Sequence, residues 1–441
     1  LWIQQVALTL PSLSSEFQVS ENHIRYTTCY LFVGLCLGAC FWGVGSDIMG
    51  RRIAFNMTLL IAGTFGLCAG FSTSWASICG LYFALGVGVG GNLPVDGALF
   101  LEFLPNASAN LLTLLSVWWP MGQFVASMGG WGFMGGNYSP DVAWRYSLYT
   151  MGTITLVMFA ARFCLFHLYE SPKYLLSHGR QAEAVAVVHG IAFRNKTTTW
   201  LTEDILNEIG GHPDIVPLET LTATQIIRKK LSSFSTKCIG PLFATKKLGL
   251  NTALLWFCWL SIGLAFPLFN GFLPQYLANG RDSSGNKISS HETYRNYAIT
   301  SIVGIPGSII ACYTVDIRYI GRKGTMAIST LMTAIMLFLF TTSRDASSQL
   351  AFSSILAFFQ NIMYGVLYAY TPEVFPSPSR GTGTGISSFL NRISGLSAPI
   401  IAANVPTGNP NVPIFTSAAL VLAAFIAMLF LSIETRGKQM L

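Results

Sequence analysis

The chain has 441 residues, of which 52% are apolar and only 10% are charged, and its formal net charge is +7. A soluble domain usually carries about 25% charged residues, so this composition excludes an ordinary soluble globular protein. It is typical of a helical protein that crosses the membrane several times. The nine cysteines lack the spacing of a metal site or a disulfide framework, and we interpret the eight that lie in or beside apolar segments as small core residues.

Apolar segments follow one another from the first residue. The segment 1–13 is too short to cross a hydrocarbon core of about 30 Å, and we interpret it as the second half of a first helix whose start is missing. Main-chain polar groups in lipid must bond within their own segment, so each apolar segment should be a helix. The sequence therefore predicts an all-α membrane protein with twelve transmembrane helices. The other segments lie at about 26–45, 53–72, 77–101, 110–134, 145–168, 247–273, 296–314, 325–342, 349–370, 382–403 and 412–433.

Lysine and arginine are distributed unequally between the two sides of the membrane. Most of them fall on the side that carries residues 50–52, 170–246 and 318–323, and fewer fall on the side that carries 278–295. Positively charged loops tend to stay in the cytosol, so we expect the first side, with both termini, to be cytosolic. This orientation depends on the excess in the 170–246 segment. We expect the plasma membrane or the membrane of an intracellular vesicle or vacuole.

Three short phrases recur in the same order in the two halves of the chain. Repeats of this kind are common in secondary transporters, which place their site at the interface of the repeats. We expect a six-helix bundle over 1–169, a cytosolic loop with two helix-like pieces over 170–246, a second bundle over 247–433 and a cytosolic tail over 434–441. The paired phrases are Asp47 with Gly50-Arg51-Arg52 and Asp316 with Gly321-Arg322-Lys323, "EFLP" at 102–105 and "EVFP" at 373–376, and "ESPK" at 170–173 and "ETRGK" at 434–438.

These phrases resemble signatures of the major facilitator superfamily. The form G-x-x-x-D-x-x-G-R-R at 43–52 is similar to its loop 2–3 signature, and the phrase at 316–323 is similar to the loop 8–9 copy. "YESPKYLL" at 169–176 and "ETRGK" are similar to phrases of the sugar porters. Pro94 with Glu102, and "YTPEVFPSPSRGTG" at 370–383, are closer to the synaptic-vesicle-protein-like and organic-ion branch. The resemblance spans nearly the whole chain and implies a transporter that works by rocking of two bundles.

The fourth apolar segment departs from the family and also contains a glycine pattern. Many members of the superfamily carry an arginine four residues before a Gly-x-Gly run, and this chain has Tyr82 there. A proton-coupling scheme that uses that arginine is therefore not expected. Gly86, Gly88 and Gly91 match G-x-G-x-x-G, but they lie inside a helical segment and not after a strand, so we interpret them as helix-packing residues.

The resemblance implies a conformational role for the charged residues at helix ends. In the family such loops hold the halves together on the cytosolic side while the cavity opens outward. The alternative is that the arginines only set the topology. Contacts between partly exposed charges are weak enough to release. The candidate gating residues are Asp47, Gly50, Arg51, Arg52, Glu102, Glu170, Asp316, Gly321, Arg322, Lys323, Glu373, Arg380 and Glu434.

Polar residues inside apolar segments are costly and are candidates for function. Asp96 has either a cavity or proton role or a structural partnership with a nearby arginine. Arg392 binds either an anionic substrate group or a fixed acid such as Asp96 or Glu373. Arg162 is expected to extend towards the cytosol with His167. The candidate substrate-binding and transport residues are Asp96, Gln123, Asn270, Asn361, Tyr364, Asn391 and Arg392.

Patterns of catalytic sites, metal sites and nucleotide-binding loops are absent from the sequence. We therefore expect no enzyme activity, no cofactor and no metal. The expected partners are a small organic solute, protons and the lipid bilayer, without nucleic acid, and the protein is expected to be a monomer. The sequence favours a secondary active transporter that works by alternating access, with proton symport as the first interpretation and facilitated diffusion as the second. The rival is a transporter-fold receptor or interaction protein that docks partners on 170–246.

Overall fold

The computed structural model is built of helices. Its regular elements, among the residues that the structure describes, are α-helices and short 3-10 helices. This confirms the all-α architecture predicted from the composition. The described residues are 1–103, 114–136, 138–164, 169–177, 179–210, 239–278, 288–315, 317, 320–343, 345–375, 380–404 and 411–435.

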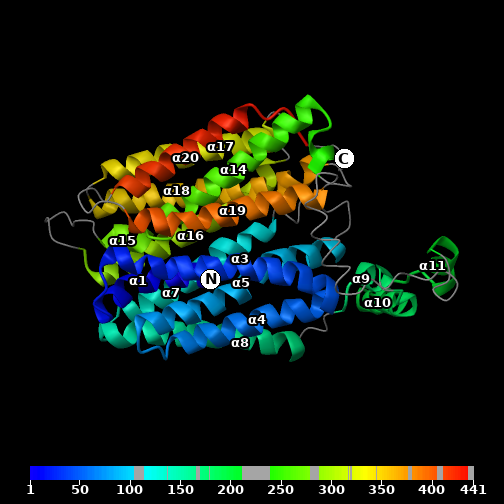
Figure 1. Ribbon diagram of the computed structural model, residues 1–441, viewed down its shortest axis with the longest axis horizontal. Coiled ribbons are helices and arrows are strands. Elements are labelled where there is room, and N and C mark those ends of the chain that lie inside the picture. The colour runs from blue at the N-terminus through cyan, green and yellow to red at the C-terminus, as the bar shows by residue number, and fades with distance from the viewer. Residues whose placement is uncertain are drawn as a thin grey trace.

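The first half of the body contains the helices up to residue 164 (Figure 1). Its long helices contain most of the residues of the first six apolar segments. The elements are α1 (Trp2–Glu16), α2 (Glu21–Ile24), α3 (Tyr26–Met49), α4 (Arg51–Ala69), α5 (Trp75–Phe103), η2 (Leu115–Val117), α7 (Trp118–Met134) and α8 (Pro140–Cys164).

The second half begins after a short 3-10 helix, η3 (Gly240–Phe243). Polar caps decide where some of its helices start. The hydroxyl of Thr245 accepts from the N–H of Leu248, and that of Ser289 accepts from the N–H of Glu292, each at 3.2 Å. The second cap starts α16 before the apolar run predicted from 296. The elements are α14 (Lys246–Asn270), α15 (Leu273–Ala278), α16 (Ser290–Thr314), α17 (Gly321–Thr342), α18 (Ala346–Val374), α19 (Arg380–Ala403) and α20 (Val412–Leu429).

The two halves pack their helices in the same pattern. In the first half α5 lies against α3 and α4, and α8 lies against α4; in the second half α18 lies against α16 and α17, and α20 lies against α17. The principal contacts between the halves are α3 with α19 and α7 with α16. By their order in each half, α3 corresponds to α16 and α7 corresponds to α19. The two contacts are therefore equivalent, and the interface itself is pseudo-symmetric.

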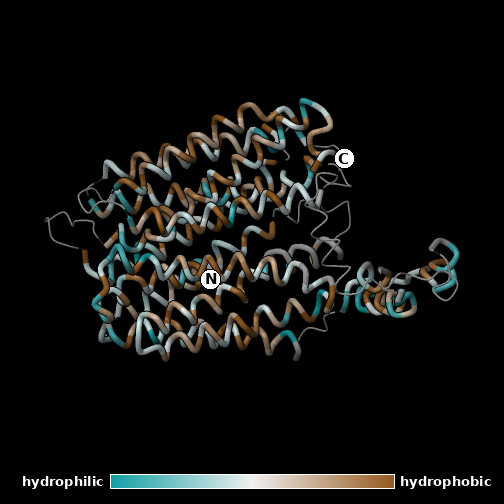
Figure 2. The backbone as a smooth tube through the Cα atoms, in the orientation of Figure 1, coloured by the Kyte–Doolittle hydropathy of each residue, from teal (hydrophilic) through white to brown (hydrophobic). Residues whose placement is uncertain are grey.

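Several of these helices are long and apolar enough to cross a membrane. Among the described residues, seven spans meet a criterion of length and hydropathy, for example Arg51–Ala69, Gly321–Thr342 and Val412–Leu429. Figure 2 shows hydrophobic residues along the helices of the body and hydrophilic ones at many helix ends and on the segment after α8. The chain is therefore an integral membrane protein.

Three helices project beyond one end of the body (Figure 1). They are α9 (Pro172–Ser177), α10 (Gln181–Arg194) and α11 (Glu203–Gly210). The latter two coincide with the helix-like pieces predicted in the 170–246 segment. We call this end of the body the Gly50 end, after the turn between α3 and α4, and the opposite end the Arg25 end.

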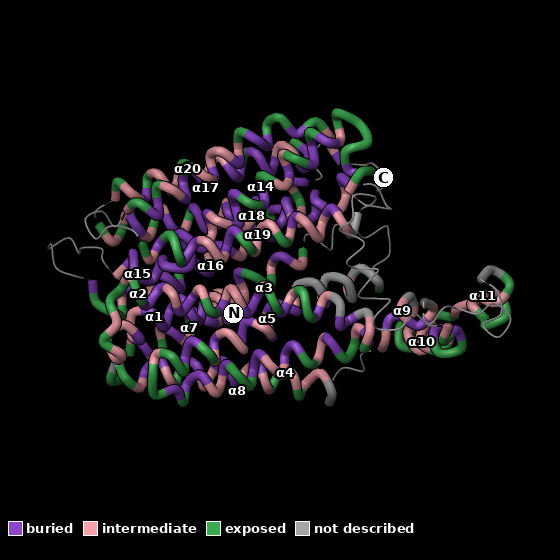
Figure 3. The backbone as a smooth tube through the Cα atoms, viewed as in Figure 1, coloured by how far each residue is buried: buried purple, intermediate pink, exposed green. Residues whose placement is uncertain are grey.

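The buried core joins the halves unequally along their length. One cluster combines residues of both halves, such as Leu8 and Tyr82 with Phe269 and Tyr297. Towards the Gly50 end, the other two clusters each belong to one half. Figure 3 shows buried backbone where α1, α15 and α16 come together. The halves therefore share a core near the Arg25 end and have separate cores near the Gly50 end.

Candidate functional site

Glu170 holds the first turn of α4 at the Gly50 end. Its Oε1 accepts hydrogen bonds from the main-chain N–H groups of Arg51 (2.9 Å) and Arg52 (3.3 Å). Gly50 has φ of +102° and ψ of 152°, a region essentially restricted to glycine. A Cβ at this position would lie 2.7 Å from Oε2 of Glu170. The glycine therefore makes the turn and also leaves room for the carboxylate.

The same arrangement recurs at the start of α17. Glu434 accepts from the main-chain N–H groups of Arg322 and Lys323, each at 3.2 Å. Gly321 has φ of +62°, and a Cβ there would lie 2.9 Å from Oε2 of Glu434. In both halves a carboxylate from beyond the last helix binds N–H groups that have no partner within their own helix, where the helix dipole is positive.

Side chains of the repeated phrases add bonds within each half. Arg322 forms an ion pair with Glu373 of α18, and both side chains are only 10% exposed. Arg51 donates to Oγ of Ser46 in α3, 2.7 Å away. These bonds connect helices of a single half, and in this structure they fix the helix ends of that half. The predicted gating residues that lie outside the described residues are Asp316 and the side chains of Asp47, Glu102 and Arg380.

Arg392 lies in the middle of α19 and reaches into the first half. Its Nη1 donates to the carbonyl of Leu35 in α3 (2.9 Å), and its Nη2 donates to the carbonyl of Gly90 in α5 (3.3 Å). No carboxylate among the described residues lies within 4 Å of this guanidinium. A fixed partnership with Glu373 is wrong, because Glu373 pairs with Arg322.

Close packing of α3 and α5 creates the pair of carbonyls that Arg392 binds. A Cβ on Gly90 would lie 2.3 Å from the carbonyl oxygen of Leu35, and one on Gly86 would lie 2.4 Å from that of Leu31. Glycine at these positions lets the two backbones touch, so two carbonyls from different helices face one guanidinium. The glycine pattern of α5 thus serves helix packing, as the sequence predicts.

Five aromatic residues extend from Tyr368 across the interface, and we call them the aromatic group: Trp119, Trp259, Phe266, Tyr364 and Tyr368. The ring centroid of Trp119, in α7 of the first half, lies 4.7 Å from that of Tyr368 and 6.3 Å from that of Tyr364. Tyr368 also contacts Trp259 (4.7 Å), and Tyr364 contacts Phe266 (5.4 Å). An electrostatic interaction connects Tyr368 with the guanidinium of Arg392.

A guanidinium in the same region as flat rings can bind an anionic group and the organic body that carries it. The planar fork of arginine matches a carboxylate, and organic ligands bind in sites with aromatic walls and few polar groups. Residues of α3, α7, α14, α18 and α19 contribute to this region, so both halves form it. This is where a transported solute would contact both moving parts.

Three of the four predicted amides have a local hydrogen-bond partner. Asn270 donates to Oε1 of Gln360 (2.9 Å), and Asn361 donates to the carbonyl one turn earlier in α18 (2.8 Å). Oδ1 of Asn391 is buried without a hydrogen bond where α19 meets α14. Gln123 lies beside the hydroxyl of Tyr297. The structure therefore brings Tyr364 and Arg392 into one region, and it places the four predicted amides in contacts between or within helices.

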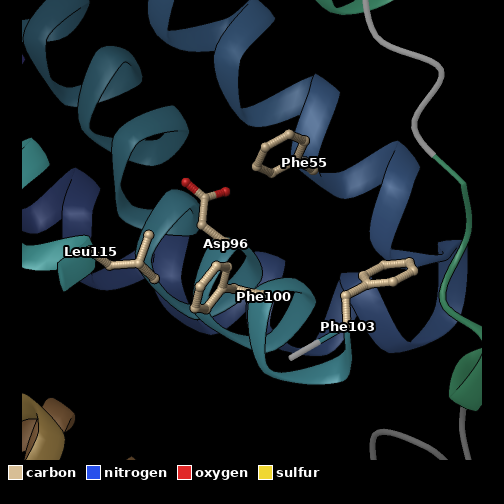
Figure 4. A pocket seen from close by; sticks show the side chains of 5 residues that line it. All are labelled: Phe55, Asp96, Phe100, Phe103 and Leu115. Atoms are coloured by element: carbon tan, nitrogen blue, oxygen red, sulfur yellow. The ribbon is translucent and has the colours of Figure 1, made fainter. Parts of the chain in front are cut away.

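Asp96 lies in a separate place, inside the first half near the Gly50 end. Figure 4 shows its carboxylate in a pocket of about 320 Å³ that is lined by Phe55, Phe100, Phe103 and Leu115. Its Oδ1 is buried and has no hydrogen bond. The nearby cation is Arg162, which stacks over the ring of Phe55 at 3.4 Å and donates to the Phe55 carbonyl at 3.1 Å.

These contacts favour a structural partnership for Asp96. Arg162 contacts α4 at Phe55, about one turn from the Gly50 end, and its predicted extension towards the cytosol stays a prediction. The predicted companion of Arg162, His167, lies outside the described residues.

The sequence did not single out several residues of the interface. Trp259 and Phe266 sit in an apolar run without a signal that separates them from core residues. Arg25 was not among the predicted site residues, although it is 7% exposed and bonds to the other half. The signal in the sequence was an arginine at the start of an apolar segment. Tyr82, which replaces the family arginine, is buried and its hydroxyl pairs with Thr9 (3.0 Å).

Comparison with known proteins identifies relatives along the whole chain. The chain is 42% identical over 452 residues to the MFS siderochrome iron transporter 1 of Ceriporiopsis subvermispora, covering 99% of this chain and 85% of the relative. It is 25% identical over 436 residues to the niacin transporter NiaP of Acinetobacter baylyi (98% and 90%). It is 26% identical over 452 residues to the synaptic vesicle 2-related protein of Xenopus laevis (98% and 75%). The likeness to the synaptic-vesicle branch agrees with the sequence phrases.

A solved structure and a family model agree with this placement. The partially occluded inward-open xylose transporter XylE from E. coli matches with a TM-score of 0.70 and 16% identity, covering 99% of this chain and 95% of that one. This likeness shows the shared fold. The model of the Major Facilitator Superfamily matches residues 2–311 and 255–439. The chain therefore belongs to the major facilitator superfamily of membrane transporters.

Proposed function

We propose that this protein is a secondary active transporter of a small organic anion with a flat ring, and that it works by alternating access. Arg392 binds the anionic group, and the aromatic group packs against the ring. The observation that carries this proposal is the position of Arg392: a guanidinium at the interface of the halves, bonded to two carbonyls and without a described carboxylate within 4 Å. A charge near the middle of a membrane is costly and usually serves the transported species.

The name of one relative supports this substrate class. Niacin, named for the transporter of Acinetobacter baylyi, is a carboxylate on an aromatic ring and has the two features that the site can bind. The siderochrome iron transporter is more similar in sequence, so an iron chelate is the second candidate.

Proton symport is the proposed coupling. Moving one negative charge into a compartment that is 100 mV negative costs about 2.3 kcal/mol. A proton that moves with the anion removes this cost, which favours symport over facilitated diffusion. Uptake into proteoliposomes that depends on a pH gradient, with the membrane potential clamped, tests the coupling.

Substrate uptake tests the proposed function itself. Proteoliposomes should accumulate labelled nicotinate, and unlabelled benzoate should compete better than the uncharged nicotinamide. Uptake of ferric siderochrome without nicotinate uptake would favour the second candidate. If folded protein takes up neither nicotinate nor ferric siderochrome, the result would favour the alternative hypothesis of a receptor, in which α9–α11 dock a partner.

The proposed orientation places the Gly50 end and α9–α11 in the cytosol, as the charge distribution suggests. In a variant without native cysteines, an impermeant maleimide applied to intact cells should label Ser139→Cys, at the Arg25 end, and should not label Phe193→Cys on α10. Both positions are exposed, and Phe193 is 84% exposed. Labelling of Phe193→Cys in sealed cells would reverse the orientation.

A further inference from the structure

Arg25 is a buried cation at the start of α3 whose described partners all belong to the other half. Its Nη1 donates to the carbonyl of Ala402 in α19 (2.6 Å), and its Nε donates to Oε1 of Gln275 in α15 (3.2 Å). Its guanidinium carbon lies 5.1 Å from the ring centroid of Phe272. The side chain therefore joins α3 to two segments of the second half.

The chemistry of these contacts suits a cation without an acidic partner. Ala402 lies in the last turn of α19, where carbonyls lack partners within their helix and the helix dipole is negative. The Gln275 oxygen and the Phe272 ring add an acceptor and a cation–π contact. No described carboxylate lies within 4 Å of Arg25. The charge is thus stabilised only while the second half lies against the first.

Other bonds cross the same seam, and water can reach it. Asn404 donates to the hydroxyl of Tyr26 (3.0 Å), and Tyr294 donates to the carbonyl of Leu8 (3.2 Å). A hollow of about 200 Å³ opens beside Gln275, formed by both halves. Its lining residues are Pro11, Ser14, Ser15, Glu21, Gln275 and Ala278. Arg25 would therefore exchange its partners for water when the halves separate at this end.

A second arginine at the same end provides a contrast. Arg145 of α8 donates to the carbonyls of Gly70 (2.9 Å) and Ser72 (2.6 Å) and pairs with Glu16 at 2.6 Å. All of these partners lie in the first half. Separation of the halves leaves this network intact, whereas it removes every described partner of Arg25.

From this difference we propose that Arg25 is a positioning residue of the transport cycle that holds the halves together at the Arg25 end. It stabilises the present state relative to a state that is open at this end. The proposal rests on alternating access, which belongs to the proposed function. Arg25 touches neither Arg392 nor the aromatic group in the described contacts, so its role is separate from solute binding.

The test measures the distance between the halves and needs no transported solute. Spin labels are attached at Ser139→Cys in the first half and Ser347→Cys in the second, both exposed positions at the Arg25 end, in a variant without native cysteines. Pulsed electron resonance then gives the populations of short and long distances. Arg25→Gln should raise the ratio of long to short distances about tenfold or more, because hydrogen bonds to charged groups are lost.

Matched variants keep the test decisive. Arg145→Gln should leave the distance distribution unchanged, although it lowers thermal stability. Gln275→Leu removes one acceptor and leaves Arg25 in place, so it should shift the ratio in the same direction by a smaller factor. Gln275→Leu also tests the proposal if Arg25→Gln does not fold.

An unchanged distance distribution in Arg25→Gln and Gln275→Leu would overturn the proposal. An equal shift in Arg145→Gln would also overturn it. Absence of solute uptake with a shifted distribution would contradict the proposed function and leave the role of Arg25 standing.

Discussion

Glu170 binds the main-chain N–H of Arg51 at 2.9 Å and does not need the arginine side chain for this contact. The carboxylate therefore acts as a helix cap, and the positive charge that matters to it is the N-terminus of α4. Glu434 repeats the contact at Arg322. Each half thus ties the start of one helix, α4 or α17, to the segment beyond its last helix. This arrangement explains why the glutamates and the Gly-Arg pairs recur together.

Loss of either capping carboxylate should destabilise the protein. Glu170→Ala and Glu434→Ala remove charge-assisted hydrogen bonds to the first turn of α4 or α17. Each should lower the free energy of unfolding by about 1–2 kcal/mol. Thermal unfolding in detergent measures the effect.

Glu183→Ala is the control for these caps. Glu183 pairs with Arg180, and the two side chains are 56% and 52% exposed, so its loss should change stability by less than about 0.5 kcal/mol. Equal effects of Glu170→Ala and Glu183→Ala would contradict the capping role.

The two turn glycines should differ in their sensitivity to a side chain. Gly50→Ala forces a residue with a Cβ into a conformation essentially limited to glycine, at about 1–3 kcal/mol. Gly321, at φ of +62°, lies in the left-handed region, which costs other residues about 1–2 kcal/mol. Thermal unfolding should rank Gly50→Ala as the more damaging. Gly80→Ala is the control, because its Cβ would meet nothing within 4 Å; a loss there as large as at Gly50 would refute the explanation.

Most of the long helices of the body could be predicted from the sequence because they lie in apolar runs of sufficient length. Their exact starts could not, since polar caps such as Ser289 extend a helix beyond the apolar run. The repeated phrases indicated two related halves, and the packing of α5 and of α18 follows the same pattern in each.

The site was harder to predict, because polarity within an apolar segment does not say which way a side chain points. Asp96 and Arg392 both stood out as charges in helices, yet Asp96 faces Phe55 within one half and Arg392 crosses to the other. The main-chain carbonyls that bind Arg392 could not be predicted from the pattern of side chains. They depend on Gly86 and Gly90, which bring α3 and α5 together.

Asp96 and Arg162 should behave as a structural pair. Arg162→Gln removes the stacking on Phe55 and its carbonyl bond, and it leaves the buried carboxylate without its nearby cation. It should therefore lower thermal stability more than Asp96→Asn does. Adding Asp96→Asn to Arg162→Gln should restore part of the loss, since the uncompensated charge is gone. Strictly additive losses in the double variant would argue against the pair.

Arg392 should determine whether the protein distinguishes charged from uncharged ligands. In the parent protein nicotinate should bind more tightly than nicotinamide, which has the same ring without the carboxylate. Arg392→Gln should weaken nicotinate binding about tenfold or more and leave nicotinamide binding nearly unchanged. Arg392→Lys should recover only part of the preference, because an ammonium lacks the planar fork.

Comparing nicotinate with nicotinamide distinguishes two roles of Arg392, which are binding the ligand carboxylate and joining the two halves. If Arg392 only joins α19 to the carbonyls of Leu35 and Gly90, its loss should change the affinities for both ligands by the same factor. A change confined to nicotinate requires contact with the carboxylate. Calorimetry on purified protein gives both affinities, and thermal unfolding of the same samples shows whether each variant is folded. An unchanged preference for nicotinate in folded Arg392→Gln would exclude Arg392 as the anion-binding residue.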